Sequence, residues 1–102
     1  MLKVDAKKAL KIANWWRDKY PLMACEEFGE LMQVLSKVER SEPERKSRYT
    51  HNYTIQDEEL RKNLVEELAD VAIAVGVLAY RYDISQDELN RQIRAKMYRR
   101  YE

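Results

Sequence analysis

The feature that most constrains the fold of this chain is an acidic motif that occurs twice. Residues 26–31 read EEFGEL, and residues 66–71 read EELADV. In a helix, carboxylates three or four positions apart share one face, and an i, i+3 pair lies roughly 4.5 Å apart along the axis. If the two helices pack together, four carboxylates converge, and each pair at about 5 Å repels by on the order of 3 kcal/mol at an effective dielectric near 20. Such a fold needs a cation between the helices, and an all-oxygen ligand set suits Mg²⁺ or Mn²⁺.

The composition fits one soluble domain that spans residues 1–102. Apolar residues make up 45% of the chain and charged residues 36%, and the net charge of +1 argues against a nucleic acid as partner. Cys25 is the only cysteine, which fits a reducing cytosol. There is no apolar signal-peptide core and no stretch near 18 apolar residues, so we expect a cytoplasmic protein that does not enter a membrane.

The spacing of apolar residues predicts an all-α fold. The chain has only two glycines and two prolines and lacks the alternation that is typical of strands. Four helices are expected, over about residues 4–19, 21–40, 56–82 and 85–101, with an irregular loop at 41–54. Ser85 and Glu88 form a capping-box pattern at the start of the last helix. Mostly short connections between the helices favour an antiparallel four-helix bundle.

The third helix carries more apolar residues than one small chain can cover. Its seam has steps of three and four residues, at Leu60, Leu64, Leu68, Val71, Val75, Leu78 and Tyr82. We therefore expect a homo-oligomer, either a homodimer or a homotetramer. In the first helix, only one residue of the Trp15–Trp16 pair can point fully inward, and Trp16 is the predicted core residue.

Carboxylates on a helix usually form a solvated face, and this interpretation suits Asp57, Glu58 and Glu59. The two motifs differ, because their acidic residues lie at or beside the apolar stripe of each helix. Spacing alone leaves a metal site and a solvated face equally open. The residues concerned are Glu27, Glu30, Glu67 and Asp70.

Glu27-x-x-Glu30 followed by Glu67-x-x-Asp70 resembles the signature of the MazG-like all-α nucleoside triphosphate pyrophosphatases. This superfamily includes dimeric dUTPases, dCTP pyrophosphatases and phosphoribosyl-ATP pyrophosphohydrolases. The segment EEFGEL resembles the first-motif helix of the family, LVEELADVAIAV the second, and AKMYRRY a basic third element. The resemblance covers about residues 20–101.

The resemblance implies an oligomeric helical bundle that hydrolyses the α–β bond of a nucleoside triphosphate, with a dNTP as the expected substrate, in housekeeping of the nucleotide pool. It implies that Glu27, Glu30, Glu67 and Asp70 bind Mg²⁺. Glu26 or Glu66 would orient or deprotonate the attacking water, unless both are merely solvated. Two features depart from the family: the gap between the motifs is longer, and Tyr98-Arg99-Arg100 replaces a segment that often includes Asn.

Basic and aromatic residues supply the candidates for substrate binding. Lys96 best matches the basic position of the family, and Arg99 and Arg100 follow on the same helix, while Lys37 is a weaker candidate. This basic helix could equally be solvated or bind an anionic surface. Trp15 either stacks on a base or covers the oligomer interface. In the loop, Tyr49, His51 and Tyr53 are candidates for a substrate edge.

Three other functions compete with this hypothesis. A carboxylate-bridged di-iron bundle uses Glu-x-x-His pairs, and neither motif contains histidine. A nucleic-acid binder would use the basic tail, but the acidic third helix opposes it. The main alternative is a non-catalytic helical interaction module whose acidic faces bind a basic partner. Which nucleotide an enzyme of this kind would prefer is not specified by any motif.

Overall fold

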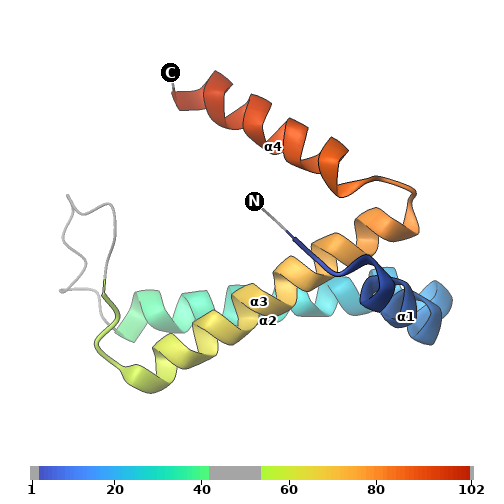
Figure 1. Cartoon of the computed structure of the whole chain (residues 1–102). Coiled ribbons are helices and arrows are strands. Elements are labelled where there is room, and N and C mark those ends of the chain that lie inside the picture. The colour runs from blue at the N-terminus through green and yellow to red at the C-terminus, as the bar shows by residue number, and fades with distance from the viewer. Residues whose placement is uncertain (1–2, 42–53, 102) are drawn as a thin grey trace.

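The computed structural model describes residues 3–41 and 54–101, and every regular element in them is helical. The elements are α1 (Ala6–Trp16), the 3₁₀ turn η1 (Arg17–Lys19), α2 (Tyr20–Ser41), α3 (Glu58–Arg81) and α4 (Gln86–Tyr101) (Figure 1). The predicted all-α class is confirmed. The expected loop at 41–54, with Tyr49, His51 and Tyr53, lies almost wholly outside the described residues.

Side-chain caps explain where three of the helices begin. The carboxylate of Asp5 accepts hydrogen bonds from the backbone N–H groups of Lys7 and Lys8, and Asp57 does the same for Glu59 and Leu60. The Ser85 hydroxyl accepts a bond of 3.1 Å from the Glu88 backbone N–H, which fits the predicted capping pattern. Such caps satisfy N–H groups that have no partner inside the helix, and each contributes about 1 kcal/mol.

The first predicted helix is shorter than expected, because the chain turns sharply after Trp16. Arg17 has a positive φ of 52° and breaks the α-helical path before η1. The Arg81 guanidinium at the end of α3 donates a 2.8 Å hydrogen bond to the Arg17 carbonyl and lies 3.4 Å from the Asp18 carboxylate. The end of α3 thus fixes the turn between α1 and α2.

The core lies where α1 and the first turns of α2 pack on the second half of α3. It is built mainly from small residues, which allow the helices to approach closely; the buried members are Ala9, Ala13, Tyr20, Ala24, Ala74 and Val77. The prediction that Trp16 is a core residue is wrong, since 37% of its surface is exposed. The helix presents its alanines to α3 and ends at Trp16, so this side chain stays at the edge of the packed region.

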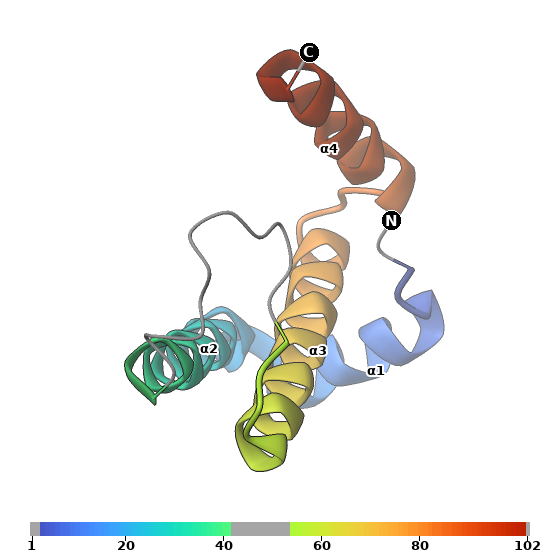
Figure 2. The ribbon, with the colours of Figure 1, turned by 90° about the vertical axis from the view of Figure 1, so that its left-hand side faces the viewer.

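Helix α4 does not lie along the others. After Asp83, which has a positive φ of 59°, the chain turns and α4 rises away from the layer that α2 and α3 form (Figures 1 and 2). None of its described side chains, up to residue 99, is buried. The expected four-helix bundle is therefore not confirmed within this chain.

The start of α4 is anchored to the N-terminal segment. The Gln86 side-chain amide accepts a 2.9 Å hydrogen bond from the Val4 backbone N–H and donates one to the Val4 carbonyl. The Val4 side chain in turn lies directly on Gly76 of α3, where an added Cβ would come within 2.6 Å of it. No helix within the described ranges 3–41 and 54–101 has the length and apolar character needed to cross a bilayer.

Candidate metal centre

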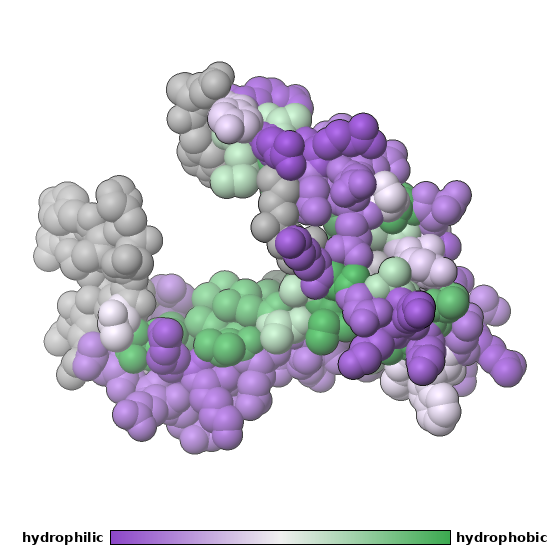
Figure 3. Space-filling model, in the orientation of Figure 1, coloured by the Kyte–Doolittle hydropathy of each residue, from purple (hydrophilic) through white to green (hydrophobic). Residues whose placement is uncertain are grey.

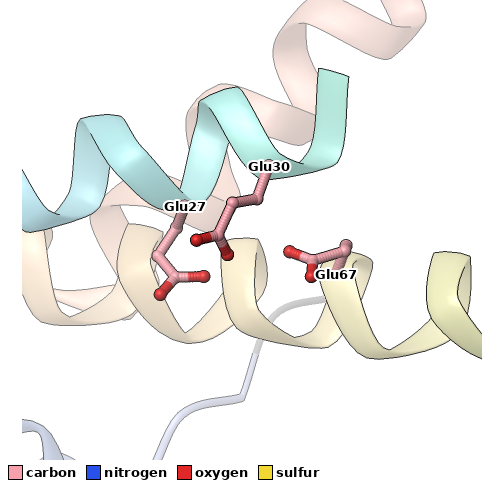
Figure 4. Close-up of side chains that lie close together, drawn as sticks. All are labelled: Glu27, Glu30 and Glu67. Atoms are coloured by element: carbon pink, nitrogen blue, oxygen red, sulfur yellow. The ribbon is translucent and has the colours of Figure 1, made fainter. Parts of the chain in front are cut away.

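The antiparallel pair α2 and α3 brings the two acidic motifs together. Glu27 and Glu30 lie on α2, and Glu67 lies on α3, with their carboxylates directed toward one another across the helix pair (Figure 4). Equivalent positions of the two motifs are separated by forty residues, so Glu27 corresponds to Glu67 and Glu30 to Asp70. The convergence that the spacing predicted is thus present for three of the four residues.

Three carboxylates form a tight group, which we call the triad: Glu27, Glu30 and Glu67. One oxygen from each of these residues lies within 4.8 Å of the others, and Glu30 is the exposed member. Asp70, the fourth predicted ligand, is exposed and outside the triad. It follows Glu67 by three positions and is therefore rotated about 60° around α3, toward the solvent. Its negative charge still acts on Glu27 and Glu67.

The crowding of like charges perturbs two members of the triad. Burial is the largest cause that raises the pKa of Glu27 above its usual 4.5, and the charges of Glu30 and Asp70 add to the effect. The pKa of Glu67 is raised for the same reasons, by desolvation first and then by Glu30 and Asp70. Both shifts mean that the charged form is destabilised relative to water. A bound cation would reverse this balance.

Two oxygen atoms of the triad also lack partners. The Oε2 atoms of Glu27 and Glu67 are buried and have no hydrogen-bond partner in the described part of the chain. A buried carboxylate oxygen without a partner is costly, and metal coordination is one way to satisfy it. The donor set consists only of carboxylates, which suits hard cations such as Mg²⁺ and Mn²⁺. The residues present therefore fit a divalent cation.

Tyr20 is a neighbour of the triad that the sequence reasoning missed. Its side chain is almost fully buried at the start of α2. Burial raises the pKa of the Tyr20 hydroxyl, and the Glu27 charge raises it further, which places the ring in the electrostatic field of the triad. The signal was present in the sequence, because Tyr20 precedes Glu27 by seven residues and so lies on the same face of α2.

Glu26 and Glu66, the two candidates for activating water, are exposed beside the triad. The charge of Glu26 contributes to the raised pKa of Glu27, and the charge of Glu66 contributes to that of Glu67. Both carboxylates are thus close enough to influence the triad, and both face solvent.

The structure does not bring the predicted substrate-binding residues to the triad within one chain. Lys37 is exposed on α2 two turns beyond Glu30. Lys96 and Arg99 are exposed on α4, whose faint red ribbon lies behind the helix pair when the carboxylates are viewed from the front (Figure 4). Arg100 belongs to α4, but its side chain is outside the described part of the structure. Trp15, at the end of α1, is 82% exposed.

No protein-family model, no curated protein and no solved structure matches this chain. The resemblance to the MazG-like superfamily therefore depends on the motif residues and their arrangement alone.

Proposed function

We propose that this chain is a Mg²⁺-dependent nucleoside triphosphate pyrophosphohydrolase that cleaves the α–β phosphate bond and releases a nucleoside monophosphate and pyrophosphate. The observation that carries the proposal is the meeting of Glu27, Glu30 and Glu67 from two separate motifs, with one oxygen from each within 4.8 Å of the others. A helical protein gains nothing in stability from this crowding, because the pKa values of two of the three carboxyls are raised. A role in holding a cation explains it.

In this proposal the triad holds the metal, and Asp70 adds either a further ligand or a negative charge beside it. The ion would neutralise negative charge on the phosphates and lower the pKa of a bound water. Mn²⁺ could substitute, since it accepts the same oxygen ligands. Glu26 and Glu66 face solvent beside the triad, where either one could accept a proton from the attacking water.

Substrate phosphates would also need cationic side chains. Lys96, Arg99 and Arg100 remain the proposed phosphate ligands, with Lys37 in a supporting role, and Trp15 remains the proposed stacking residue. The exposed positions of Lys37, Lys96, Arg99 and Trp15 leave these side chains free to bind a ligand. The substrate would be a nucleoside triphosphate, with deoxynucleotides favoured by the resemblance, and a homodimer or homotetramer in the cytoplasm would be the working form.

The test is incubation of the purified protein with a panel of NTPs and dNTPs in the presence of Mg²⁺, followed by identification of the products. We expect pyrophosphate and a monophosphate, and we expect Glu67→Gln to abolish their formation. Glu59→Gln is the matched control, because it makes the same chemical change in the first turn of α3, outside the triad. Orthophosphate as the sole product, or equal turnover by Glu67→Gln, would overturn the proposal.

A second measurement separates the enzyme from the interaction module. Metal binding at about 100 times Kd stabilises a folded protein by about 2.7 kcal/mol. For a domain of this size that shift corresponds to a rise in melting temperature of roughly 10 °C or more. Binding of a basic protein partner that is independent of Mg²⁺, with no thermal shift and no turnover, would instead support the non-catalytic module.

A further inference from the structure

The outward side of α1 combines positive charge with an exposed tryptophan. Helix α1 packs on α3 through Ala9 and Ala13, and the side chains on its opposite side face solvent. Steps of three and four residues place these side chains in one stripe along the helix. The stripe, which we call the basic face, consists of Lys7, Lys8, Lys11 and Trp15.

The members of the basic face are available to a partner. Trp15 is 82% exposed, more than any other large apolar side chain that is described. Within residues 3–41 and 54–101, the ammonium groups of the three lysines form no ion pair, and α1 itself contains no acidic residue. Figure 3 shows strongly hydrophilic side chains gathered at the place that α1 occupies in Figure 1. Lysines alone would be an ordinary solvated face, but a large amphipathic ring held out among them is typical of an interface.

Positive charge is concentrated at this end of the chain. Residues 3–19 contain six basic residues and two acidic ones, whereas the whole chain has a net charge of only +1. The remainder of the chain, with the acidic motifs, is therefore net negative. Both acidic residues near α1 are already engaged, since Asp5 caps the helix and Asp18 lies 3.4 Å from the Arg81 guanidinium. An anionic partner would thus be attracted to α1 and repelled by the acidic motifs.

We propose that the basic face of α1 binds the surface of an anionic phospholipid bilayer, with the lysines on the headgroup phosphates and the Trp15 ring at the boundary with the acyl chains. Lysines and tryptophan on one side of a helix supply the two contacts that interfacial binding requires. Binding of this kind needs no spanning helix. The proposal does not rest on the proposed function, because α1 turns this face away from α3, which bears Glu67.

The size and shape of the basic face favour a bilayer over a macromolecular partner. Helix α1 has 11 residues and is about 16 Å long, so one side of it covers much less than the ~800 Å² that each partner buries in a standard protein interface. Single-stranded nucleic acid is bound in grooves where several aromatic rings stack on successive bases. The basic face has one aromatic ring on a convex surface. A bilayer imposes neither requirement, because each positive charge near it adds its own attraction.

The expected strength of binding follows from these contacts. Each lysine close to an anionic bilayer strengthens binding by about fivefold, and burial of the Trp15 ring adds on the order of tenfold. The three lysines and the ring together give a factor of about 10³, which corresponds to half-maximal binding near ~1 mM accessible lipid. At about 1 M salt the Debye length falls to about 3 Å, so the contribution of the lysines should disappear.

The test is co-sedimentation of the intact protein with vesicles of phosphatidylcholine and phosphatidylserine in equal parts, and with vesicles of phosphatidylcholine alone. We expect binding to the mixed vesicles only, and its loss at about 1 M salt. Lys7→Gln combined with Lys11→Gln should weaken binding by about 25-fold. Arg91→Gln combined with Arg94→Gln is the matched control, because it removes the same charge from exposed positions on α4 and should change binding little.

Tryptophan fluorescence distinguishes insertion of the ring from adsorption by charge. Mixed vesicles should shift the emission to the blue, and this shift should persist in Trp16→Phe and be absent from Trp15→Phe. Absence of binding to mixed vesicles would overturn the proposal, as would equal weakening by the α1 and α4 double variants or a blue shift that Trp15→Phe retains. Binding of a single-stranded oligonucleotide through the same lysines, without binding to vesicles, would assign the basic face to nucleic acid instead.

Failure of this proposal is distinguishable from failure of the proposed function. Glu67→Gln should leave vesicle binding unchanged, because the triad lies outside the basic face. Lys7→Gln combined with Lys11→Gln should leave pyrophosphate release unchanged, because neither lysine is a proposed substrate ligand. One indole cannot contact a base and a bilayer at the same time, so the lysine variants rather than Trp15→Phe provide the comparison with turnover.

Discussion

Replacing Glu27 with Gln tests whether repulsion between the carboxylates of the triad destabilises the metal-free protein, and whether a bound metal ion removes that repulsion. Glu27 lies within reach of Glu30 and Glu67, and its pKa is raised by burial and by its acidic neighbours. Gln has nearly the same shape and can donate a hydrogen bond to a neighbouring carboxylate. The metal-free variant should therefore be more stable than the metal-free wild type, although most substitutions at partly buried positions destabilise a protein.

The expected gain follows from the separation of the charges. At 4.8 Å, the upper limit for the oxygens of the triad, two carboxylates repel by about 3.5 kcal/mol at a dielectric of 20 and by about 1 kcal/mol in water. Glu27 is only partly shielded from solvent, so screening places the relief near the lower value, about 1 kcal/mol. For a domain of this size, 1 kcal/mol corresponds to a rise of roughly 4–8 °C in melting temperature.

Thermal melts with chelator and with saturating Mg²⁺ provide the assay. Without metal, Glu27→Gln should melt above the wild type; with Mg²⁺ the order should reverse, because the wild type gains about 2.7 kcal/mol at 100 times Kd and the variant has lost a ligand. Glu59→Gln is the control and should melt slightly lower in both conditions, since it removes a favourable charge at the start of α3. A metal-free variant that melts at or below the wild type would refute the repulsion argument.

Three further predictions concern stability. The pKa values of the Glu27 and Glu67 carboxyls in the folded protein are raised above their usual 4.5, so the stability that these groups contribute is present at low pH and is lost as the pH rises through the raised values. The melting temperature of the metal-free protein should therefore fall toward neutral pH, and it should fall less in Glu27→Gln. Equal dependence of the melting temperature on pH in the two proteins would contradict this. Gly29→Ala should raise the free energy of unfolding by up to about 1 kcal/mol, since no atom lies within 4 Å of the new Cβ. Gly76→Ala should give no such gain, because its Cβ would meet the Val4 side chain at 2.6 Å. Denaturation curves of the two variants, measured in parallel, check this. Asp57→Ala should cost about 1 kcal/mol in the same assay, through loss of the cap of α3.

The sequence predicts the helices to within a few residues because local chemistry decides where they begin. Ser85 and the acidic caps belong to a few adjacent positions, and their hydrogen bonds form within one turn. The shared face of Glu27 and Glu30 is predictable for the same reason, since residues three apart share a face in any helix, whereas their meeting with Glu67 depends on the packing of α2 against α3. Asp70 was expected as an equal ligand, but spacing alone does not say how far the face of α3 is turned toward α2.

Features that depend on long-range contacts were beyond the sequence reasoning. The direction of α4 depends on the backbone of Asp83 and on the Gln86–Val4 pair, which joins residues at opposite ends of the chain. Similarly, α1 ends early because Arg81, far along the chain, bonds to the Arg17 carbonyl. Neither contact leaves a local pattern, and the expectation of a bundle within one chain therefore had no basis in periodicity alone.

The forty-residue repeat explains how one layer can combine a repulsive site with a stable helix pair. Glu27 and Glu67 occupy equivalent positions in α2 and α3, and so do Phe28 and Leu68. Each helix thus carries an acidic flank beside an apolar flank, and antiparallel packing places like flanks on the same side. The repulsion between the acidic side chains acts against the association of α2 with α3, while burial of the core residues Ala24, Ala74 and Val77 favours it.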